Sequence, residues 1–291
     1  MDRNKIQADK YIDEVKSLPP APTTTIELLG LLDDPNSHLD RFVELIRHDP
    51  ALTAKILKRV NSAHFSLGEP TMDIFEVITR LGFYEVYCVV AAATGASIMA
   101  LGKAKDRLDI NLFWRHSVVT AVAAEKLARR VQEPAAVAFT AGLLHDIGKL
   151  IFAAANDTRY ADLIKAADVA GGDLSAMEQM AFGVNHAAIG ARLLRRWGLP
   201  ESILLAVGQH HGALNAAQPS AQLVAIIQLA NAIAHHLSEP APALRDWSSS
   251  QPEAMTLLKL ANPDVPALIA EIAMGLQRVQ GFSTQQFDPV I

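Results

Sequence analysis

The eight residues 142–149 read GLLHDIGK and interrupt a long apolar segment with an imidazole, a carboxylate and an amine. Apolar residues dominate positions 135–141 before the interruption and 150–153 after it. The charged groups are therefore expected inside the fold, where burying them without partners is costly. A divalent cation held between His145 and Asp146 is one source of compensation, because both residue types ligate metals.

The composition indicates a helical protein. Hydrophobic residues make up 50% of the 291 residues, whereas aromatic residues make up only 6%. Strand-rich chains usually draw more heavily on aromatic and β-branched side chains, so we expect an all-α fold. The length exceeds the needs of a single small core, which favours a multi-helix bundle of two packed helical subdomains.

Charge and cysteine content restrict the functional class and the compartment. A net charge of -5 attracts no phosphate backbone, so it excludes general nucleic-acid binding. The lone Cys88 excludes an intramolecular disulfide, and residues 1–5 lack the apolar core of a signal peptide. The longest weakly polar run, 86–102, is too short for a typical spanning helix. We therefore expect a cytoplasmic protein that does not enter a membrane.

Helix signals divide the chain into segments. Residues 37–40 (SHLD) resemble a capping box, and Asp49-Pro50 places a capping carboxylate before a proline at the first helical position. The break at 81–83 (LGF) and the composition shifts at 101–109 and 239–242 predict connectors. The expected segments are an N-terminal helix (1–17), an N-terminal helical part (18–105), a second helical subdomain (106–238) and C-terminal helices (239–291).

Further histidines accompany the segment 142–149 in a fixed order. His116 precedes it, His186 follows near an expected helix start, and the pair His210-His211 lies near an expected helix end. This order resembles that of the HD superfamily of metal-dependent phosphohydrolases. Single His-Asp dipeptides are common, but this order combined with GLLHDIGK is specific.

The N-terminal part narrows the resemblance to the HDOD family, the HD-related output domains of bacterial signalling. The matching signature is LPPAP (18–22), DPAL (49–52), NSAHF (61–65) and LG (81–82). Around His186 the similar residues are Glu178, Phe182-Gly183, Gly190 and Trp197. The resemblance extends from about residue 18 to about residue 236. It implies an all-α regulatory domain with an HD-type core in its second subdomain, generally without demonstrated hydrolase activity.

Two departures separate this chain from hydrolytic relatives of the superfamily. After His211 the chain continues GALNAA (212–217), without the Gly-Tyr-Pro loop of the HD-GYP phosphodiesterases. The closing aspartate of HD enzymes aligns with Asn231, a neutral amide that weakens metal binding. Among the matched positions only Asp146 then offsets the charge of a metal, with Glu178 as an extra carboxylate. One ion is therefore favoured over two.

The resemblance implies a pocket for a divalent metal such as Fe, Mn, Zn or Mg. Its first ligands are His116, His145 and Asp146, completed or flanked by His186, His210, His211 and Asn231. Lys149 would act only in a hydrolase, where it could steady a phosphate oxygen while a metal-bound water attacks.

Each of these residues also has a structural interpretation, which the sequence leaves open. His145 and Asp146 could be a hydrogen-bonded pair kept for packing, and Lys149 could pair with a nearby carboxylate or reach solvent. His186 could belong to a helix first turn capped by Asn185, and His210-His211 could favour a helix C-terminus.

Other polar residues outside the pattern receive structural interpretations. Arg195-Arg196 suit a solvated helix face, and Asn61-Ser62 suit a cap or turn. Cys88 suits a small buried position without redox chemistry. Surface or interface positions are expected for His38, His48, His64, His235 and His236.

Three functions remain open, and the least favoured is a pure scaffold with an empty pocket. The leading hypothesis is a non-catalytic HDOD-type signalling module with an HD-like metal pocket, acting through a signalling protein partner. The alternative is a metal-dependent phosphohydrolase or phosphodiesterase acting on a nucleotide or cyclic dinucleotide. The matched histidines, Asp146 and Lys149 support the enzyme, whereas Asn231 and the absent loop weaken it.

Overall fold

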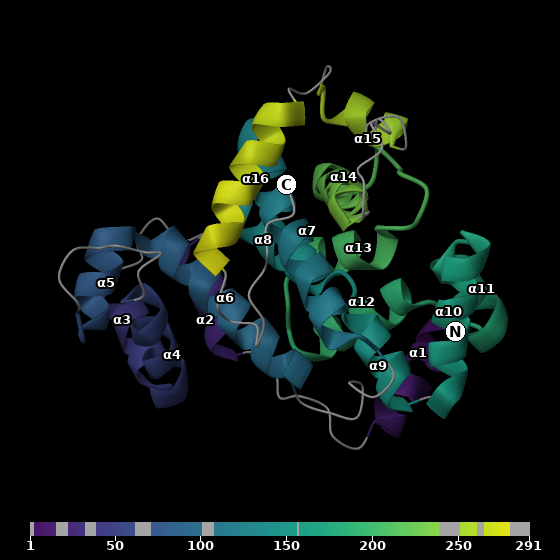
Figure 1. The fold of residues 1–291 in the computed structure, drawn as a ribbon, viewed down its shortest axis with the longest axis horizontal. Helices are drawn as coiled ribbons and strands as arrows, with labels where there is room; N and C mark the ends of the chain where they lie inside the picture. Colours follow the sequence, from purple (N-terminus) through teal and green to yellow (C-terminus); the bar gives the residue numbers. More distant parts are fainter. Residues whose placement is uncertain are drawn as a thin grey trace.

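The computed structural model describes residues 3–15, 23–32, 39–61, 71–100, 108–155, 157–238, 251–260 and 265–279. These residues form helices joined by turns, without a strand among them, which confirms the expected all-α fold (Figure 1). The helices are α1 (Arg3–Glu14), α2 (Thr23–Leu32), α3 (Leu39–Arg47), α4 (Pro50–Val60), α5 (Ile74–Leu81), α6 (Phe83–Ala100), α7 (Ile110–Arg130), α8 (Ala135–Leu144), α9 (Ile147–Ala155), α10 (Asp157–Ala170), α11 (Leu174–Phe182), α12 (His186–Arg196), α13 (Glu201–Gln209), α14 (Ala221–Ser238), α15 (Pro252–Leu257) and α16 (Val265–Val279).

Several expected helix boundaries are confirmed. The Asp49 carboxylate accepts a hydrogen bond from the Leu52 amide at 2.9 Å, as a cap of α4 should. Gly82 separates α5 from α6 with φ of 86°, a conformation that glycine adopts without strain. The C-terminal helices expected within 239–291 are α15 and α16.

Other expectations concern residues outside those that the structure describes. They are the start of the capping box at 37–38, the signature residues 18–22 and 62–65, residues 101–107 of the connector expected at 101–109, and the whole connector at 239–242. Asn61 itself is described. Its side-chain amide donates to Thr71 O at 2.7 Å and accepts from Thr71 N at 2.9 Å, which supports its structural interpretation.

The helices pack as two neighbouring groups. The first contains α2 to α6, which Figure 1 shows together at one side. The second is built around α7, which packs against α8 and α14, and continues through α9, α12 and α13. The apolar helix α6 joins the groups by contacting α7 and α8. Although α1 begins the chain, it packs on α9 and α12 of the second group.

Burial explains the most apolar segments. Within the described residues, one stretch, Ala135–Ala155, is apolar and long enough to cross a membrane by length and composition. However, 89% of its most apolar window is buried inside the protein, so it is a core segment made of α8 and α9. Cys88 on α6 is buried as expected.

Candidate metal centre

The structure brings all the sequence-predicted site residues together from five places in the second group. His116 lies on α7, His145 and Asp146 at the junction of α8 and α9, and His186 at the first position of α12. The pair His210-His211 follows the end of α13, and Asn231 lies on α14. Asp146 belongs to two sets of converging ligand atoms, one on each side of its carboxylate.

Two glycines of the segment 142–149 allow this convergence. A Cβ on Gly142 would lie 2.8 Å from Ala121 Cα and 2.9 Å from Thr120 O on α7. A Cβ on Gly148 would overlap the carbonyl oxygen of His186, at the start of α12. The missing side chains therefore let α8 approach α7 and let α9 approach α12, so that His116 and His186 flank Asp146 from opposite sides.

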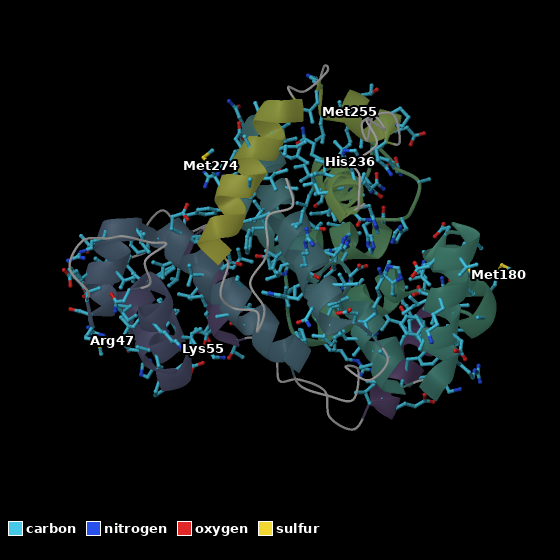
Figure 2. All side chains as sticks on the ribbon, viewed as in Figure 1. Arg47, Lys55, Met180, His236, Met255 and Met274 are labelled. Carbon is cyan, nitrogen blue, oxygen red and sulfur yellow. The ribbon has the colours of Figure 1, made fainter. Side chains whose placement is uncertain are left out.

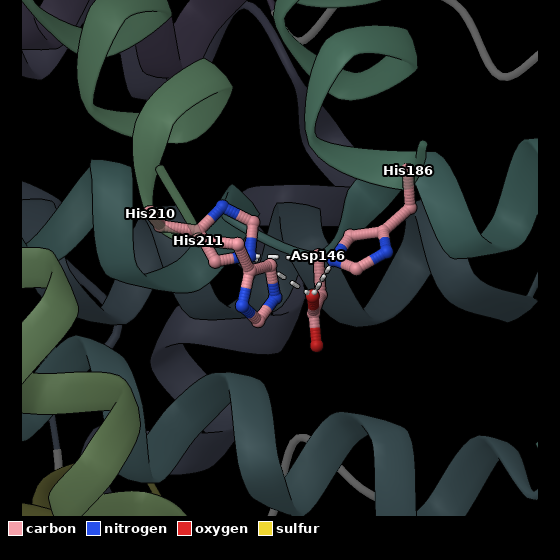
Figure 3. Close-up of side chains that lie close together, drawn as sticks. All are labelled: Asp146, His186, His210 and His211. Atoms are coloured by element: carbon pink, nitrogen blue, oxygen red, sulfur yellow. Dashed lines mark hydrogen bonds and ion pairs between the residues drawn. The ribbon is translucent and has the colours of Figure 1, made fainter. Parts of the chain in front are cut away.

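The first set contains Asp146, His186, His210 and His211 (Figure 3). The Asp146 Oδ1 atom lies 3.2 Å from His186 Nε2 and 3.6 Å from His210 Nε2. The two imidazole Nε2 atoms lie 3.3 Å from each other. His186 and His210 are buried, whereas His211 lies at the exposed rim, so this set is open to solvent on one side.

The second set contains His116, His145 and Asp146, with Asn231 beside them. The Asp146 Oδ2 atom lies 3.3 Å from His145 Nε2 and 3.7 Å from His116 Nε2. His116 Nε2 also lies 2.9 Å from Asn231 Oδ1, an atom that only accepts, so with this amide orientation the imidazole donates to it.

Hydrogen bonds on the far side of three imidazoles settle which ring nitrogen faces inward. His145 Nδ1 donates to Gly142 O at 2.8 Å, and His210 Nδ1 donates to Val207 O at 2.7 Å. His186 Nδ1 donates to the Glu178 carboxylate at 2.6 Å. Carbonyl and carboxylate oxygens can only accept, so each Nδ1 carries a proton, and in the neutral ring the Nε2 lone pair points at Asp146.

The arrangement fits a cation. Asp146 Oδ1 is buried without a hydrogen-bond partner among the described residues, and it faces the Nε2 atoms of His186 and His210. Lone pairs that converge on an unsatisfied carboxylate oxygen repel one another, and a positive ion between them removes the repulsion. Imidazole nitrogens with carboxylate oxygen are a donor set of zinc and other first-row metals.

Two of the imidazoles and the carboxylate have the ionisation states that metal ligation requires. Burial lowers the pKa of His210 to about 4, and burial together with the nearby His145 holds the pKa of His116 well below its usual value. Burial opposes ionisation of Asp146, yet the neighbouring His145 and Lys149 bring its pKa well below its ordinary range. At neutral pH these two imidazoles are neutral and the carboxylate is ionised. At His186 burial opposes protonation, but the neighbouring Glu178 raises the pKa above its usual value, so this ring loses a proton when it ligates a metal.

Lys149 pairs with a carboxylate, as one of its two structural interpretations anticipated. Its ammonium lies 2.7 Å from Asp146 Oδ2, one helical turn away. The side chain is mostly buried and provides one positive charge beside the second set. The pair therefore occupies the side of the carboxylate that faces His116 and His145.

The sequence did not predict the place of two residues at the site, and it named a third residue without its role. His235 is exposed, as expected, but its ring also lies 4.6 Å from that of His116, and its spacing of four residues from Asn231 was an available signal for this contact. Tyr160 donates to Glu178 at 2.8 Å, and no sequence pattern pointed to it. Glu178 was expected only as an extra charge, whereas it binds His186 directly.

Comparisons with known proteins agree with this fold. The HDOD domain family model matches residues 18–213. The match ends before α14, so Asn231 lies outside it and the resemblance is shorter than the expected end near residue 236. An uncharacterized protein of Treponema pallidum (strain Nichols) is 27% identical over 237 residues, which cover 81% of this chain. The chain spans only 45% of that relative's length.

Solved structures share the architecture. An HDOD domain protein with unknown function from Geobacter sulfurreducens superposes with a TM-score of 0.80 at 23% identity, covering 97% of this chain and 99% of its own. A candidate phosphohydrolase from Shewanella amazonensis SB2B gives a TM-score of 0.69 at 24% identity, covering 96% and 98%. At these identities the likeness shows the fold alone.

Proposed function

The chain belongs to the HDOD domain family, and we propose that it is a regulatory module that binds one divalent metal ion in its His/Asp cluster and contacts a signalling protein partner. The metal holds the pocket together or senses a ligand, and it does not drive hydrolysis. The proposal of a bound metal rests on the buried Asp146 Oδ1 atom, which faces two imidazole nitrogens and has no other partner among the described residues.

Charge favours one ion and selects its side of the carboxylate. In the second set, Lys149 already neutralises Asp146 Oδ2 and Asn231 already accepts from His116. In the first set, Asp146 Oδ1 has no hydrogen-bond partner among the described residues. We therefore assign the ion to the set of Asp146, His186, His210 and His211, rather than to the set led by His116. The nitrogen-rich donors suit zinc, iron or manganese better than magnesium.

Asn231 supports regulation over hydrolysis. A bound metal can lower the pKa of water enough to make a nucleophile at neutral pH. Catalysis of phosphate transfer also needs positive charge held against the substrate by anionic ligands, and here Asn231 contributes only a neutral amide. The Lys149 ammonium is paired with Asp146, so it is not free to meet a phosphate unless that pair opens.

The metal assignment predicts different results for two matched histidine variants. His210→Ala should lower Co²⁺ affinity by more than the about 10–100-fold that loss of an outer partner costs, whereas His116→Ala should stay below about tenfold. Titration of chelator-treated protein, followed by Co²⁺ absorption, measures both. His48→Ala, an exposed change away from the cluster, is the control. Equal losses in both variants would contradict the assignment, and no binding by the unaltered protein would end the metal proposal.

A phosphohydrolase is the second candidate, and the location of Lys149 favours it. The ammonium lies beside the cluster on the side where His116 is partly exposed, within reach of an anion that displaced it from Asp146. The test is turnover of nucleotide monoesters and cyclic dinucleotides with manganese or iron. Turnover that disappears in His145→Ala would replace the regulatory proposal, while metal binding without turnover would support it.

Partner binding rests on family membership. Exposed apolar side chains are scattered, for example Met180 on α11 and Met274 on α16, which Figure 2 shows at different sides of the molecule. They therefore select no single docking face. Affinity capture with the full chain, followed by direct binding to each purified candidate, tests the proposed partner binding. A candidate that fails direct binding is rejected, and failure of all of them would remove the partner from the proposal.

A further inference from the structure

We infer that Glu178 and Tyr160 form a positioning pair that keeps the His186 proton on Nδ1 and so sets the metal affinity of the cluster from outside it. The inference rests on the metal-binding half of the proposed function. Neither residue can reach the metal itself, because Glu178 lies behind the imidazole and Tyr160 lies behind Glu178.

Glu178 fixes His186 through one carboxylate oxygen. Its Oε2 atom accepts from the His186 amide at 2.7 Å and from His186 Nδ1 at 2.6 Å. A single acceptor shared by the backbone and the ring of one residue leaves the ring little freedom to rotate. The chain reverses at Gly183, whose φ is 74°, and this turn returns α12 to the side chain of Glu178 on α11.

Tyr160 fixes the other carboxylate oxygen. Its hydroxyl donates to Glu178 Oε1 at 2.8 Å, and its ring is fully buried and stacked on Phe152 with centroids 5.0 Å apart. Burial raises the pKa of Tyr160 well above its usual value, and the nearby Glu178 raises it further. The phenol therefore stays protonated and always donates. Both oxygens of the buried carboxylate are then satisfied.

The pair decides what occupies the inner face of His186. If the proton moved to Nε2, it would point at Asp146 Oδ1, satisfy that oxygen and exclude a metal ion. With the proton held on Nδ1 by a carboxylate, Nε2 offers a lone pair and the imidazole becomes a more basic ligand. Glu178 and Tyr160 thus hold the neutral imidazole of His186 in the tautomer that can bind a metal between His186 and Asp146.

Three variants test the pair. Glu178→Gln keeps the shape and removes the charge, and it should lower Co²⁺ affinity by about 10–100-fold. Tyr160→Phe keeps the ring and removes one hydrogen bond, so a loss of about twofold to tenfold is expected. Both should shift the Co²⁺ absorption bands. Tyr87→Phe is the matched control, because Tyr87 is equally buried and its hydroxyl meets Thr140 away from the cluster.

A second readout needs no metal. Side-chain ¹⁵N spectra of the metal-free protein, with labelled histidine at mildly alkaline pH, distinguish protonated from unprotonated ring nitrogens. The unaltered protein should show His186 protonated on Nδ1, with a mixture of tautomers in Glu178→Gln. If the unaltered protein binds no metal, the proposed function fails. The spectrum would still show whether Glu178 holds the His186 proton on Nδ1.

Three results would overturn the inference. They are an unchanged tautomer in Glu178→Gln, an Nε2 proton in the unaltered protein, and Co²⁺ affinity in Tyr160→Phe equal to that of a binding-competent Tyr87→Phe. Thermal melts establish that each variant is folded. If Glu178→Gln does not fold, the Co²⁺ affinity and the Co²⁺ absorption spectrum of Tyr160→Phe test the inference instead.

Discussion

Gly148 is the residue on which the cluster depends most directly through packing. A Cβ there would lie 2.9 Å from Gly190 N and 2.8 Å from the carbonyl carbon of His186, in addition to its overlap with the carbonyl oxygen. These are backbone atoms, which cannot swing aside as the end of a side chain can. The helices α9 and α12 would have to separate, and His186 would move away from Asp146.

Gly148→Ala should therefore lower stability and metal binding together. Overpacking of this kind typically costs about 1–3 kcal/mol in the free energy of unfolding. Denaturant unfolding measures that cost, and Co²⁺ titration measures the affinity, which should fall with the displaced imidazole.

Gly30→Ala is the matched control. It makes the same change on α2, where a Cβ would meet nothing within 4 Å, and should raise stability by about 0.5–1 kcal/mol through helix propensity. A Gly148→Ala protein with unchanged stability and affinity would show that the close approach of α9 and α12 does not hold the site.

At the scale of the element, α1 is held on the second helical group by charge. Arg192 on α12 binds both carboxylate oxygens of Asp9 at 2.8 Å each, and Arg196 binds Asp9 at 2.5 Å and Asp13 at 2.6 Å. Arg195 and Arg196 are both exposed, as expected of a solvated face, but the packing of α1 also makes Arg196 an interhelical contact. Arg195 meets Glu201 at an exposed site, as a solvated residue can.

The α1 clamp should weaken in acid. The hydrogen bond from Arg192 lowers the pKa of Asp9, with a smaller contribution from Arg196, and burial only partly opposes this. A carboxylate with a depressed folded-state pKa contributes stability above its unfolded pKa of about 3.9 and loses it as pH falls through the folded value. The contribution should be modest, about 0.5–1 kcal/mol, because the pairs are partly exposed.

Melting curves of the full chain and of Asp9→Asn across acid pH measure this effect. The stability difference between them should be constant near neutral pH and shrink as pH falls below about 4. Asp40→Asn, on an exposed position of α3, provides the comparison. A difference that stays the same throughout the acid range would rule out the ion pairs as the source.

At the scale of the whole molecule, the cluster joins helices that are distant in sequence. Its residues come from α7, the α8–α9 junction, α12, the end of α13 and α14, and a bound ion would tie these elements at one point. No described side chain of α3 to α5 belongs to it.

Metal binding should therefore stabilise the molecule unevenly. A ligand that binds only the folded state contributes about 2.7 kcal/mol at 100 times its dissociation constant. Metal should raise the melting temperature, a chelator should reverse the rise, and amide hydrogen exchange should slow at the start of α12 and the end of α13 more than in α3 to α5. His210→Ala should show neither effect, and an equal rise in that variant would point to a site elsewhere.

Much of the architecture followed from local rules in the chain. The Asp49 cap and the Gly82 break act over a few residues, so the sequence alone predicted the start of α4 and the boundary between α5 and α6. The resemblance of the histidine order around GLLHDIGK to the HD superfamily likewise named the histidines and the aspartate that the structure brings together.

Only the tertiary structure decided how those residues are used. It sets Lys149 on one side of Asp146 and leaves Oδ1 open on the other, and it places Glu178 and Tyr160 behind His186. These contacts depend on the direction of side chains from separate helices, which no short-range pattern encodes. The residues of the pocket could thus be read from the sequence, whereas the side that suits a cation depends on packing at Gly142 and Gly148.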